Sequence, residues 1–169
     1  MDAPEQEDAS SSPNAKNITD FIDAEKTALR LIARAEQCKS GLSRKLEKHK
    51  YDPAVIDEVI SKFIESKLID DSRYTRLWLQ SRLRLTRSPR QLLVSLCSKG
   101  IERDEAEAAL RAVLDEETEY SLIERFVKKT QKKAARKKNK SEEINRSLKS
   151  LLRMEGFSLE VINEYLEKE

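Results

Sequence analysis

One internal repeat constrains this chain more than any other feature of its sequence. Two leucines stand eight and four residues before each of three turn positions, and an apolar residue follows each turn position directly. The turn positions are Lys50, Gly100 and Gly156. The leucine pairs are Leu42 and Leu46, Leu92 and Leu96, and Leu148 and Leu152. The shared register predicts three copies of one structure, whereas generic leucine-rich hairpins would not register at so many positions.

Each copy has the pattern of a short helix, a tight turn and a second helix. Glycine at two of the turn positions fits this pattern, because a helix often ends with a residue at positive φ, which glycine adopts without steric cost. One longer helix is predicted in front of each pair, and the three ranges are 20–38, 70–87 and 116–138. The predicted unit is therefore a set of three helices, with turn positions 50 and then 56 residues apart.

The composition predicts an all-α fold. Charged residues make up 38% of the 169 residues and aromatic residues 5%, with three glycines and four prolines. The chain therefore lacks the β-branched and aromatic runs and the glycine-rich turns of an all-β protein. Because one three-helix unit of this size buries little surface, neighbouring copies must share apolar contacts. We expect three tandem repeats in an elongated, possibly curved array.

The predicted organisation has four regions. Residues 1–19 are acidic and polar, and we expect them to be disordered because they have few apolar side chains to offset the entropy cost of ordering. The three repeats follow at 20–66, 67–115 and 116–169, and the third has a strongly basic long helix.

No pattern in the sequence indicates a catalytic, metal or cofactor site. Cys38 and Cys97 are far apart, and we expect reduced thiols rather than a disulfide. His49 lies in a polar run, where a solvated helix end is expected rather than a catalytic base. Glycine-rich phosphate loops and triad spacings do not occur, and no apolar run has the length of a membrane span. We expect a soluble, cytoplasmic and monomeric protein that is not an enzyme.

Charge is distributed in alternating blocks, although the net charge is only +2. Residues 72–101 hold six arginines and one lysine with no acid, and residues 102–119 hold eight acids and two arginines. Residues 128–140 carry eight basic side chains in thirteen positions. Acid-free blocks of this length favour surfaces that bind anions.

The first candidate binding face lies on the helix predicted at 70–87. A helical wheel predicts a packing face there, and its members are Tyr74, Leu77, Trp78, Ser81 and Leu85. An adjacent arc collects Arg73, Arg76, Arg84 and Arg87, and Arg90 follows at the start of the next helix. Arginine grips phosphate or carboxylate at two points, which favours an anion-binding face over an ordinary charged surface. Tyr74 and Trp78 are predicted to be structural core residues rather than aromatic residues that stack on nucleic-acid bases.

The second candidate face lies on the helix predicted at 116–138. Its lysines cover half of the cylinder, a pattern typical of non-specific phosphate binding, and a solvated spacer helix is the alternative. The binding residues expected there are Lys128, Lys132, Lys133 and Arg136. Two basic faces on successive repeats suggest one continuous track. We expect phosphate contact rather than sequence readout, since no base-reading element is evident.

Three segments carry a resemblance to a known family. They are Leu68-Ile69-Asp70-Asp71-Ser72-Arg73-Tyr74, Arg87-Ser88-Pro89-Arg90-Gln91-Leu92, and Leu96-Cys97-Ser98-Lys99-Gly100-Ile101. The chain resembles the RecX family of recombination regulators over residues 24–166. Lys50, Lys67, Thr75 and Ser95 depart from the family pattern, in which glycine is frequent at the first two positions. These departures affect turns and surface rather than the helical framework.

The resemblance implies a regulatory protein that binds the RecA recombinase filament on single-stranded DNA. Such a protein would lower the ATPase, strand-exchange and co-protease activities of the recombinase. The candidate residues above come from the helical wheel and not from the family. Two alternatives stay open, namely a helix-turn-helix-like regulator that acts on DNA directly and a protein–protein scaffold without DNA affinity.

Overall fold

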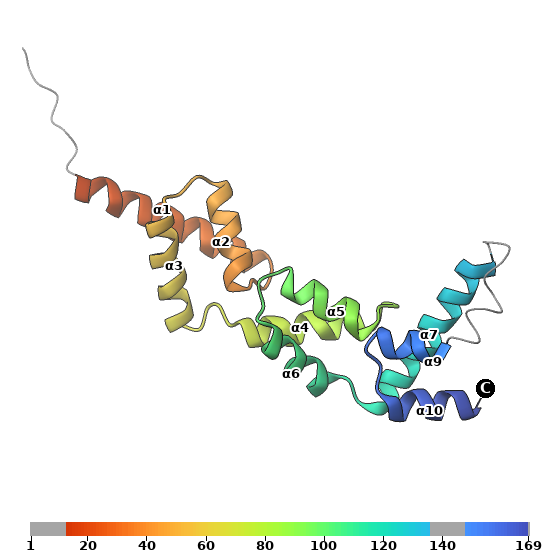
Figure 1. Cartoon of the computed structure of the whole chain (residues 1–169). Coiled ribbons are helices and arrows are strands. Elements are labelled where there is room, and N and C mark those ends of the chain that lie inside the picture. Colours follow the sequence, from red (N-terminus) through yellow and green to blue (C-terminus); the bar gives the residue numbers. More distant parts are fainter. Residues whose placement is uncertain (1–12, 136–147, 169) are drawn as a thin grey trace, which may run out of the picture. The chain divides into compact units, whose positions relative to one another are not determined.

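The computed structural model describes residues 13–135 and 148–168, and all regular structure in these two stretches is helical (Figure 1). This confirms the all-α fold class. The helices are α1 (Pro13–Arg34), α2 (Lys39–Lys48), α3 (Pro53–Glu65), α4 (Asp71–Leu83), α5 (Pro89–Cys97), α6 (Arg103–Val113), α7 (Glu116–Ala135), α9 (Leu148–Met154) and α10 (Leu159–Lys168).

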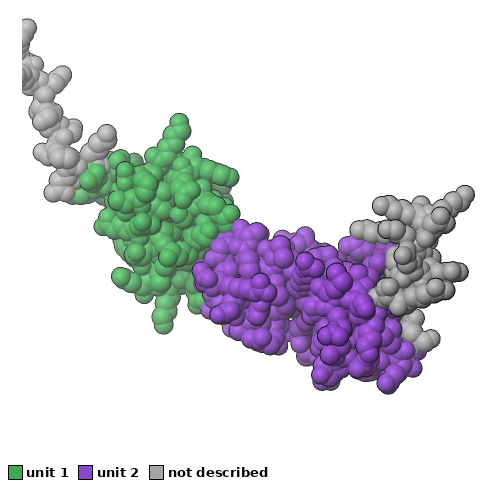
Figure 2. Space-filling view, in the orientation of Figure 1, with its two compact units in different colours: residues 1–70 green, residues 71–169 purple. Residues whose placement is uncertain are grey.

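The chain divides into two compact units (Figure 2). The first unit ends at Asp70 and the second begins at Asp71. The division therefore falls four residues after the repeat boundary predicted at residue 66. Ile69 is 3% exposed and belongs to the core of the first unit, which places residues 67–70 with the first repeat. The boundary predicted at residue 115 coincides with the residue before α7.

The first unit is one three-helix repeat in which α1, α2 and α3 pack against one another. Its core forms because each helix directs one apolar stripe inward. Buried members are Ala24 and Ala28 from α1, Leu42 and Leu46 from α2, and Val55, Ile56, Val59, Ile60 and Phe63 from α3. The predicted leucine pair, Leu42 and Leu46, is thus confirmed as core.

The second unit contains two further sets of three helices. Within the first set, α4, α5 and α6 pack together, and in the second set α7 and α9 both pack against α10. Leu92, Leu96 and Leu152 are fully buried, as the repeat predicts. Leu83 and Leu114 of the first set pack against the apolar cluster of the second set. The sharing of apolar contacts between neighbouring copies is therefore confirmed within this unit.

All three predicted turn positions have left-handed backbone conformations. The φ angles are +64° at Lys50, +87° at Gly100 and +86° at Gly156. Behind Gly100 the amide of Ile101 donates to the carbonyl of Leu96 at 3.3 Å, and behind Gly156 the amide of Phe157 donates to Leu152 at 3.2 Å. These bonds satisfy helix-terminal carbonyls as in a Schellman motif, and the apolar residue after each glycine is buried.

The long helices differ from their predicted bounds. Helix α1 begins at Pro13, so the prediction of a disordered tail is wrong for residues 13–19. Proline suits a first helical position, where its missing N–H costs nothing. Helix α4 ends at Leu83 rather than at residue 87, and α7 extends to Ala135 within the described residues. The tail at 1–12 and the end predicted at 138 lie outside the described residues.

The packing face predicted for α4 is also wrong. The buried residues of this helix are Thr75 and Leu79. Leu77 is 46% exposed and Leu85 43% exposed, while Tyr74 and Trp78 are half-buried. The buried stripe therefore lies one residue further along the helix than predicted, and Leu85 lies beyond the end of the helix.

Candidate functional site

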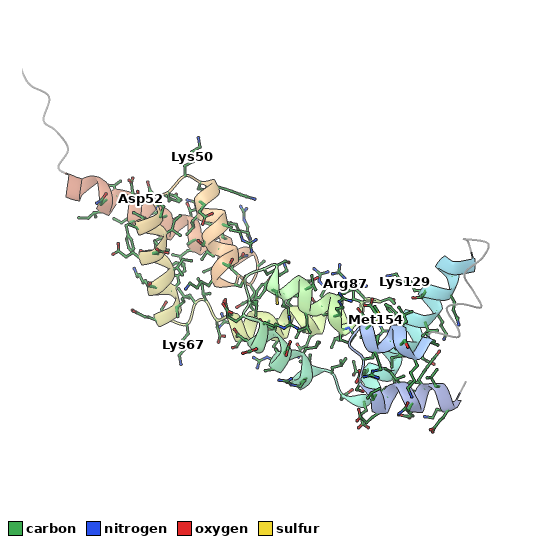
Figure 3. All side chains as sticks on the ribbon, in the orientation of Figure 1. Lys50, Asp52, Lys67, Arg87, Lys129 and Met154 are labelled. Carbon is green, nitrogen blue, oxygen red and sulfur yellow. The ribbon has the colours of Figure 1, made fainter. Side chains whose placement is uncertain are left out.

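A basic cleft lies in the second unit, where the loop between α4 and α5 (residues 84–88) faces α7. Its volume is about 940 Å³. It is lined by Leu85, Thr86, Arg87, Gln91, Arg125, Lys128, Lys129 and Lys132. Five of these eight side chains are cationic and none is acidic. Figure 3 shows Arg87 and Lys129, which come from the two walls, near each other on one side of the second unit.

The cleft brings the two predicted basic faces together. Arg87 belongs to the first predicted face, and Lys128 and Lys132 belong to the second. Lys128 and Lys132 are exposed, while Arg87 is half-buried and its Nη1 donates to the Ser95 hydroxyl at 3.4 Å. Among the described residues, no acidic side chain forms an ion pair with any of these three cations. Their charge is therefore available to an anionic ligand.

Arg125 lines the cleft, and its guanidinium binds main-chain carbonyl oxygens of α4, of the following loop and of α7 itself. Its Nη2 donates to the carbonyl of Leu83 and its Nη1 to the carbonyl of Arg84, each at 3.1 Å. Its Nε donates to the carbonyl of Ser121 at 3.0 Å. The Leu83 and Arg84 carbonyls lie at the C-terminus of α4, where the helix dipole is negative and carbonyls lack helical partners.

Lys129 extends this arrangement by one helical turn. Its Nζ donates to the carbonyl of Thr86 at 3.1 Å, in the middle of the loop. Arg125 and Lys129 are four residues apart and so lie on one face of α7. Together they attach the loop to α7 through three carbonyl oxygens.

A second, smaller cavity of about 370 Å³ adjoins the basic cleft and shares Arg87 and Gln91 with it. Its other lining residues are Arg90, Val94, Ser95 and Glu155. Arg90 is exposed in the first turn of α5, where the positive end of the helix dipole favours anions. The Glu155 carboxylate makes this cavity less positive than the basic cleft.

The beginning of α5 is fixed to the turn after α9. Ser88 is the N-cap, and its hydroxyl accepts from the Gln91 amide at 3.3 Å while donating to the Glu155 carboxylate. The Arg90 amide donates to the Glu155 carbonyl at 2.9 Å. Gly156 lies in this turn with φ of +86°, a conformation that side chains rarely adopt. These contacts hold Arg87 and Arg90 in a defined place.

The other predicted binding residues lie apart from the cleft or outside the description. Arg73 and Arg76 are on α4, and neither lines either cavity. Arg84 lies beyond the end of α4, so the prediction that it shares one helical face with Arg73, Arg76 and Arg87 is wrong. Arg136 and the Lys133 side chain are outside the described part of the chain.

Sequence reasoning missed Arg125 and did not select Lys129 as a binding residue. Both residues are recognisable only through their partners, since main-chain carbonyls leave no mark in a sequence. Their spacing of four positions was the available signal, because it places two cations on one face of a helix. Gln91 was quoted only as part of a motif, and it lines both cavities.

Tyr74 and Trp78, which were predicted to be structural core residues, are half-buried. The Trp78 ring carries two cations, with the Arg82 guanidinium carbon 5.6 Å and the Lys99 Nζ 5.9 Å from its centre. Cations over an indole face are attracted by its quadrupole. Trp78 thus joins α4 to the end of α5, a structural role at the edge of the repeat.

The described helices contain none long and apolar enough to cross a membrane. Nor do the residues at 13–135 and 148–168 bring together three or more histidine, cysteine or acidic side chains that could hold a metal ion. Cys38 and Cys97 form no disulfide.

Comparisons with known proteins give the family. Residues 24–63 match the family model described as RecX, first three-helix domain. The regulatory protein RecX of Treponema pallidum is 32% identical over 112 residues, which cover 66% of this chain and 68% of that protein. The regulatory protein RecX of Caldanaerobacter subterraneus is 27% identical over 150 residues, which cover 89% of this chain and 72% of that protein.

Two solved structures share the fold. The crystal structure of RecX from Lactobacillus salivarius has a TM-score of 0.69 at 21% identity, covering 89% of this chain and 97% of that one. A second crystal structure of regulatory protein RecX has a TM-score of 0.77 at 17% identity, covering 91% of this chain and 75% of that one. The repeat, the fold and the sequence matches agree, and the chain belongs to the RecX family of regulatory proteins.

Proposed function

We propose that this RecX-family regulator binds the RecA recombinase filament on single-stranded DNA. Binding lowers the ATPase, strand-exchange and co-protease activities of the recombinase. The chain works as a monomer in the cytoplasm. The observation that supports the DNA contact is the basic cleft, in which five cations meet without an acidic partner among the lining residues.

The chemistry of the cleft suits a phosphate backbone. Arg87 offers a planar fork to phosphate oxygens, while Lys128 and Lys132 act as point charges on the opposite wall. Three such contacts should give the logarithm of the single-strand affinity a slope of about −2 against the logarithm of salt concentration, at about 0.7 per phosphate. Because no lining group is placed to read base edges in a groove, binding is independent of sequence.

Inhibition follows from binding across filament subunits. A chain of tandem repeats that contacts more than one recombinase subunit would change filament turnover at each site where it binds. The ATPase should therefore fall at protein levels well below one per recombinase subunit. A purely protein–protein scaffold would instead leave DNA affinity negligible even at low salt.

The test is DNA-stimulated recombinase ATPase with added protein, together with anisotropy on bare single strands at two salt concentrations. The variant Arg87→Glu, Lys128→Glu, Lys132→Glu reverses the charge of the cleft. Its matched control, Lys48→Glu, Arg111→Glu, Arg153→Glu, makes the same charge change at exposed positions outside both cavities. We expect the cleft variant to lose DNA affinity and inhibition, and the control variant to retain most of both.

Two results would contradict the proposal. Equal inhibition by wild type and the cleft variant would exclude the cleft as the contact. Preference for one duplex sequence by roughly 10³-fold or more over random DNA would favour the helix-turn-helix alternative, because a groove reader gains that much from base contacts. A third variant, Arg73→Glu, Arg76→Glu, tests whether α4 contributes to DNA affinity and to inhibition separately from the cleft.

A further inference from the structure

We infer that Arg125 is a positioning residue that assembles the basic cleft from two neighbouring repeats and does not itself bind phosphate. It holds the α4–α5 loop of the second repeat against α7 of the third repeat, so that Arg87 faces Lys128 and Lys132. The inference rests on the proposed function only where DNA is the probe.

The hydrogen bonds of Arg125 connect its guanidinium to main-chain oxygens of the protein. A guanidinium has five N–H donors and no acceptor. Three different nitrogens of Arg125 donate to carbonyl oxygens, namely those of Leu83, Arg84 and Ser121, at 3.0–3.1 Å. A phosphate could form a bidentate pair with Arg125 only through nitrogens that already donate to carbonyl oxygens. Every nitrogen of the guanidinium therefore already has a protein partner.

The last residue of the loop, Ser88, is held by the Glu155 carboxylate in the turn after α9, whereas residues 84–87 depend on other contacts. Their backbone bonds are local, with the Leu85 amide donating to Arg82 and the Arg87 amide to Leu85, each at 2.9 Å. Such bonds shape the loop but do not attach it to α7. Attachment comes from Arg125 and, one turn further, from Lys129 through the Thr86 carbonyl.

Arg125 lies outside the apolar cluster that stabilises α7. Leu122, Ile123, Phe126 and Val127 of α7 are buried in the cluster that α9 and α10 complete. Arg125 is only half-buried at the rim of that cluster. Its removal should therefore leave α7 in place and Ser88 bound to Glu155, while residues 84–87 are released from α7 and Arg87 no longer faces the two lysines.

A double-mutant cycle on salt dependence tests the inference, since each phosphate contact contributes about 0.7 to the slope for a single strand. If Arg125 acts through Arg87, then Arg125→Met and Arg87→Gln each reduce the slope by about 0.7, and the double variant loses no more than either single variant. Arg111→Gln, an exposed α6 residue in the same unit, is the matched control and should leave the slope unchanged. A loss of about 1.4 in the double variant would show that Arg125 binds phosphate independently and would overturn the inference.

Limited trypsin digestion tests the loop without DNA. In Arg125→Met, cleavage after Arg84 and Arg87 should accelerate roughly fivefold or more, the change that the loss of one net hydrogen bond would produce. Unchanged cleavage rates would overturn the inference even if DNA binding were confirmed. Faster cleavage in a protein whose wild type does not bind DNA would support the positioning role and refute the proposed function.

A second variant guards against a folding defect. Arg125→Lys keeps the charge but cannot reproduce the forked geometry, and a lysine is not equivalent to an arginine at such a site. We expect it to fold as the wild type does by circular dichroism and to show the same non-additivity with Arg87→Gln. Wild-type salt slope and digestion rate in Arg125→Lys would show that charge alone suffices and would overturn the inference.

Discussion

The Glu119 carboxylate accepts two hydrogen bonds from Ser158, one from its amide at 2.6 Å and one from its hydroxyl at 2.9 Å. Glu119 is in the first turn of α7 and Ser158 directly precedes α10, so this pair joins two helices of the third repeat. Glu119 is 6% exposed, which makes it one of the few buried charged residues in the described chain. A negative charge at a helix N-terminus is stabilised by the free amides there.

Glu119→Ala should lower the free energy of unfolding of the second unit by about 2 kcal/mol, because it leaves a buried amide and hydroxyl without their acceptor. Glu117→Ala, an exposed glutamate in the same turn of α7, is the control and should change the value much less. Urea unfolding followed by circular dichroism gives both numbers. Equal effects from the two substitutions would mean that the Ser158 contact contributes nothing to stability.

Lys50 and Lys67 adopt left-handed conformations, with φ of +64° and +57°. Because a side chain at positive φ costs roughly 1–2 kcal/mol and glycine avoids this cost, Lys50→Gly and Lys67→Gly should each stabilise the first unit by up to about 1 kcal/mol after the entropy of glycine is subtracted. Thermal melts measure the effect. Lys48→Gly, inside α2, should destabilise by about 1 kcal/mol, so the opposite sign at neighbouring positions is the decisive observation.

Gly156 has φ of +86°, and a Cβ there would meet the Arg90 nitrogen at 3.4 Å and the Pro89 Cβ at 3.5 Å. Because these are ordinary contact distances, Gly156→Ala should destabilise the second unit by roughly 1–2 kcal/mol from the backbone φ alone. Gly100→Ala has the same φ cost, so chemical denaturation should give similar losses for the two variants. A much larger loss at Gly156 would show that the added Cβ displaces α5.

Asp115 precedes α7, and its Oδ1 accepts from the Thr118 amide at 2.8 Å. Hydrogen bonds from the Thr118 side chain and then from its backbone amide lower the pKa of Asp115 below its ordinary value. A carboxyl whose pKa is lower in the folded state stabilises the fold above its unfolded pKa of about 3.9 and loses this contribution as pH falls through the folded pKa.

Asp115→Asn keeps a capping acceptor but cannot titrate. Melting temperatures of wild type and variant from pH 2 to 6 should differ most above pH 5 and converge at the acid end. Parallel curves over the whole range would exclude the Asp115 hydrogen bonds as a source of acid sensitivity. Glu160→Gln, at an exposed position in the first turn of α10, serves as a carboxyl control.

The repeat was predictable because its determinants are local. Leucines at fixed distances from a turn and a glycine at its end specify the helix, its buried stripe and its termination. Lys50 shows how strong that register is, since it takes the left-handed conformation of its two glycine counterparts despite the steric cost.

The end of α4 was not predictable in the same way. Nothing between Leu83 and Pro89 forbids a further helical turn. At the observed end, Arg125 and Lys129 bind carbonyl oxygens of the preceding repeat, and the local sequence gives no sign of these contacts. In the same helix Leu77, Trp78 and Leu79 are consecutive apolar residues that cannot all face the core. Packing against α5 and α6 buries Leu79, while the Leu77 side chain remains exposed.

The attachment of the α4–α5 loop to α7 has a consequence for anyone who recombines these repeats. Residues 83–88 of the second repeat and residues 125–132 of the third repeat form one structural unit, although they belong to different repeats. A chimera that replaces the third repeat but keeps residues 83–88 would leave the Leu83 and Arg84 carbonyls without the Arg125 guanidinium, and the cleft would be lost with that contact. Grafts made from this chain should therefore keep residues 83–88 and 125–132 together.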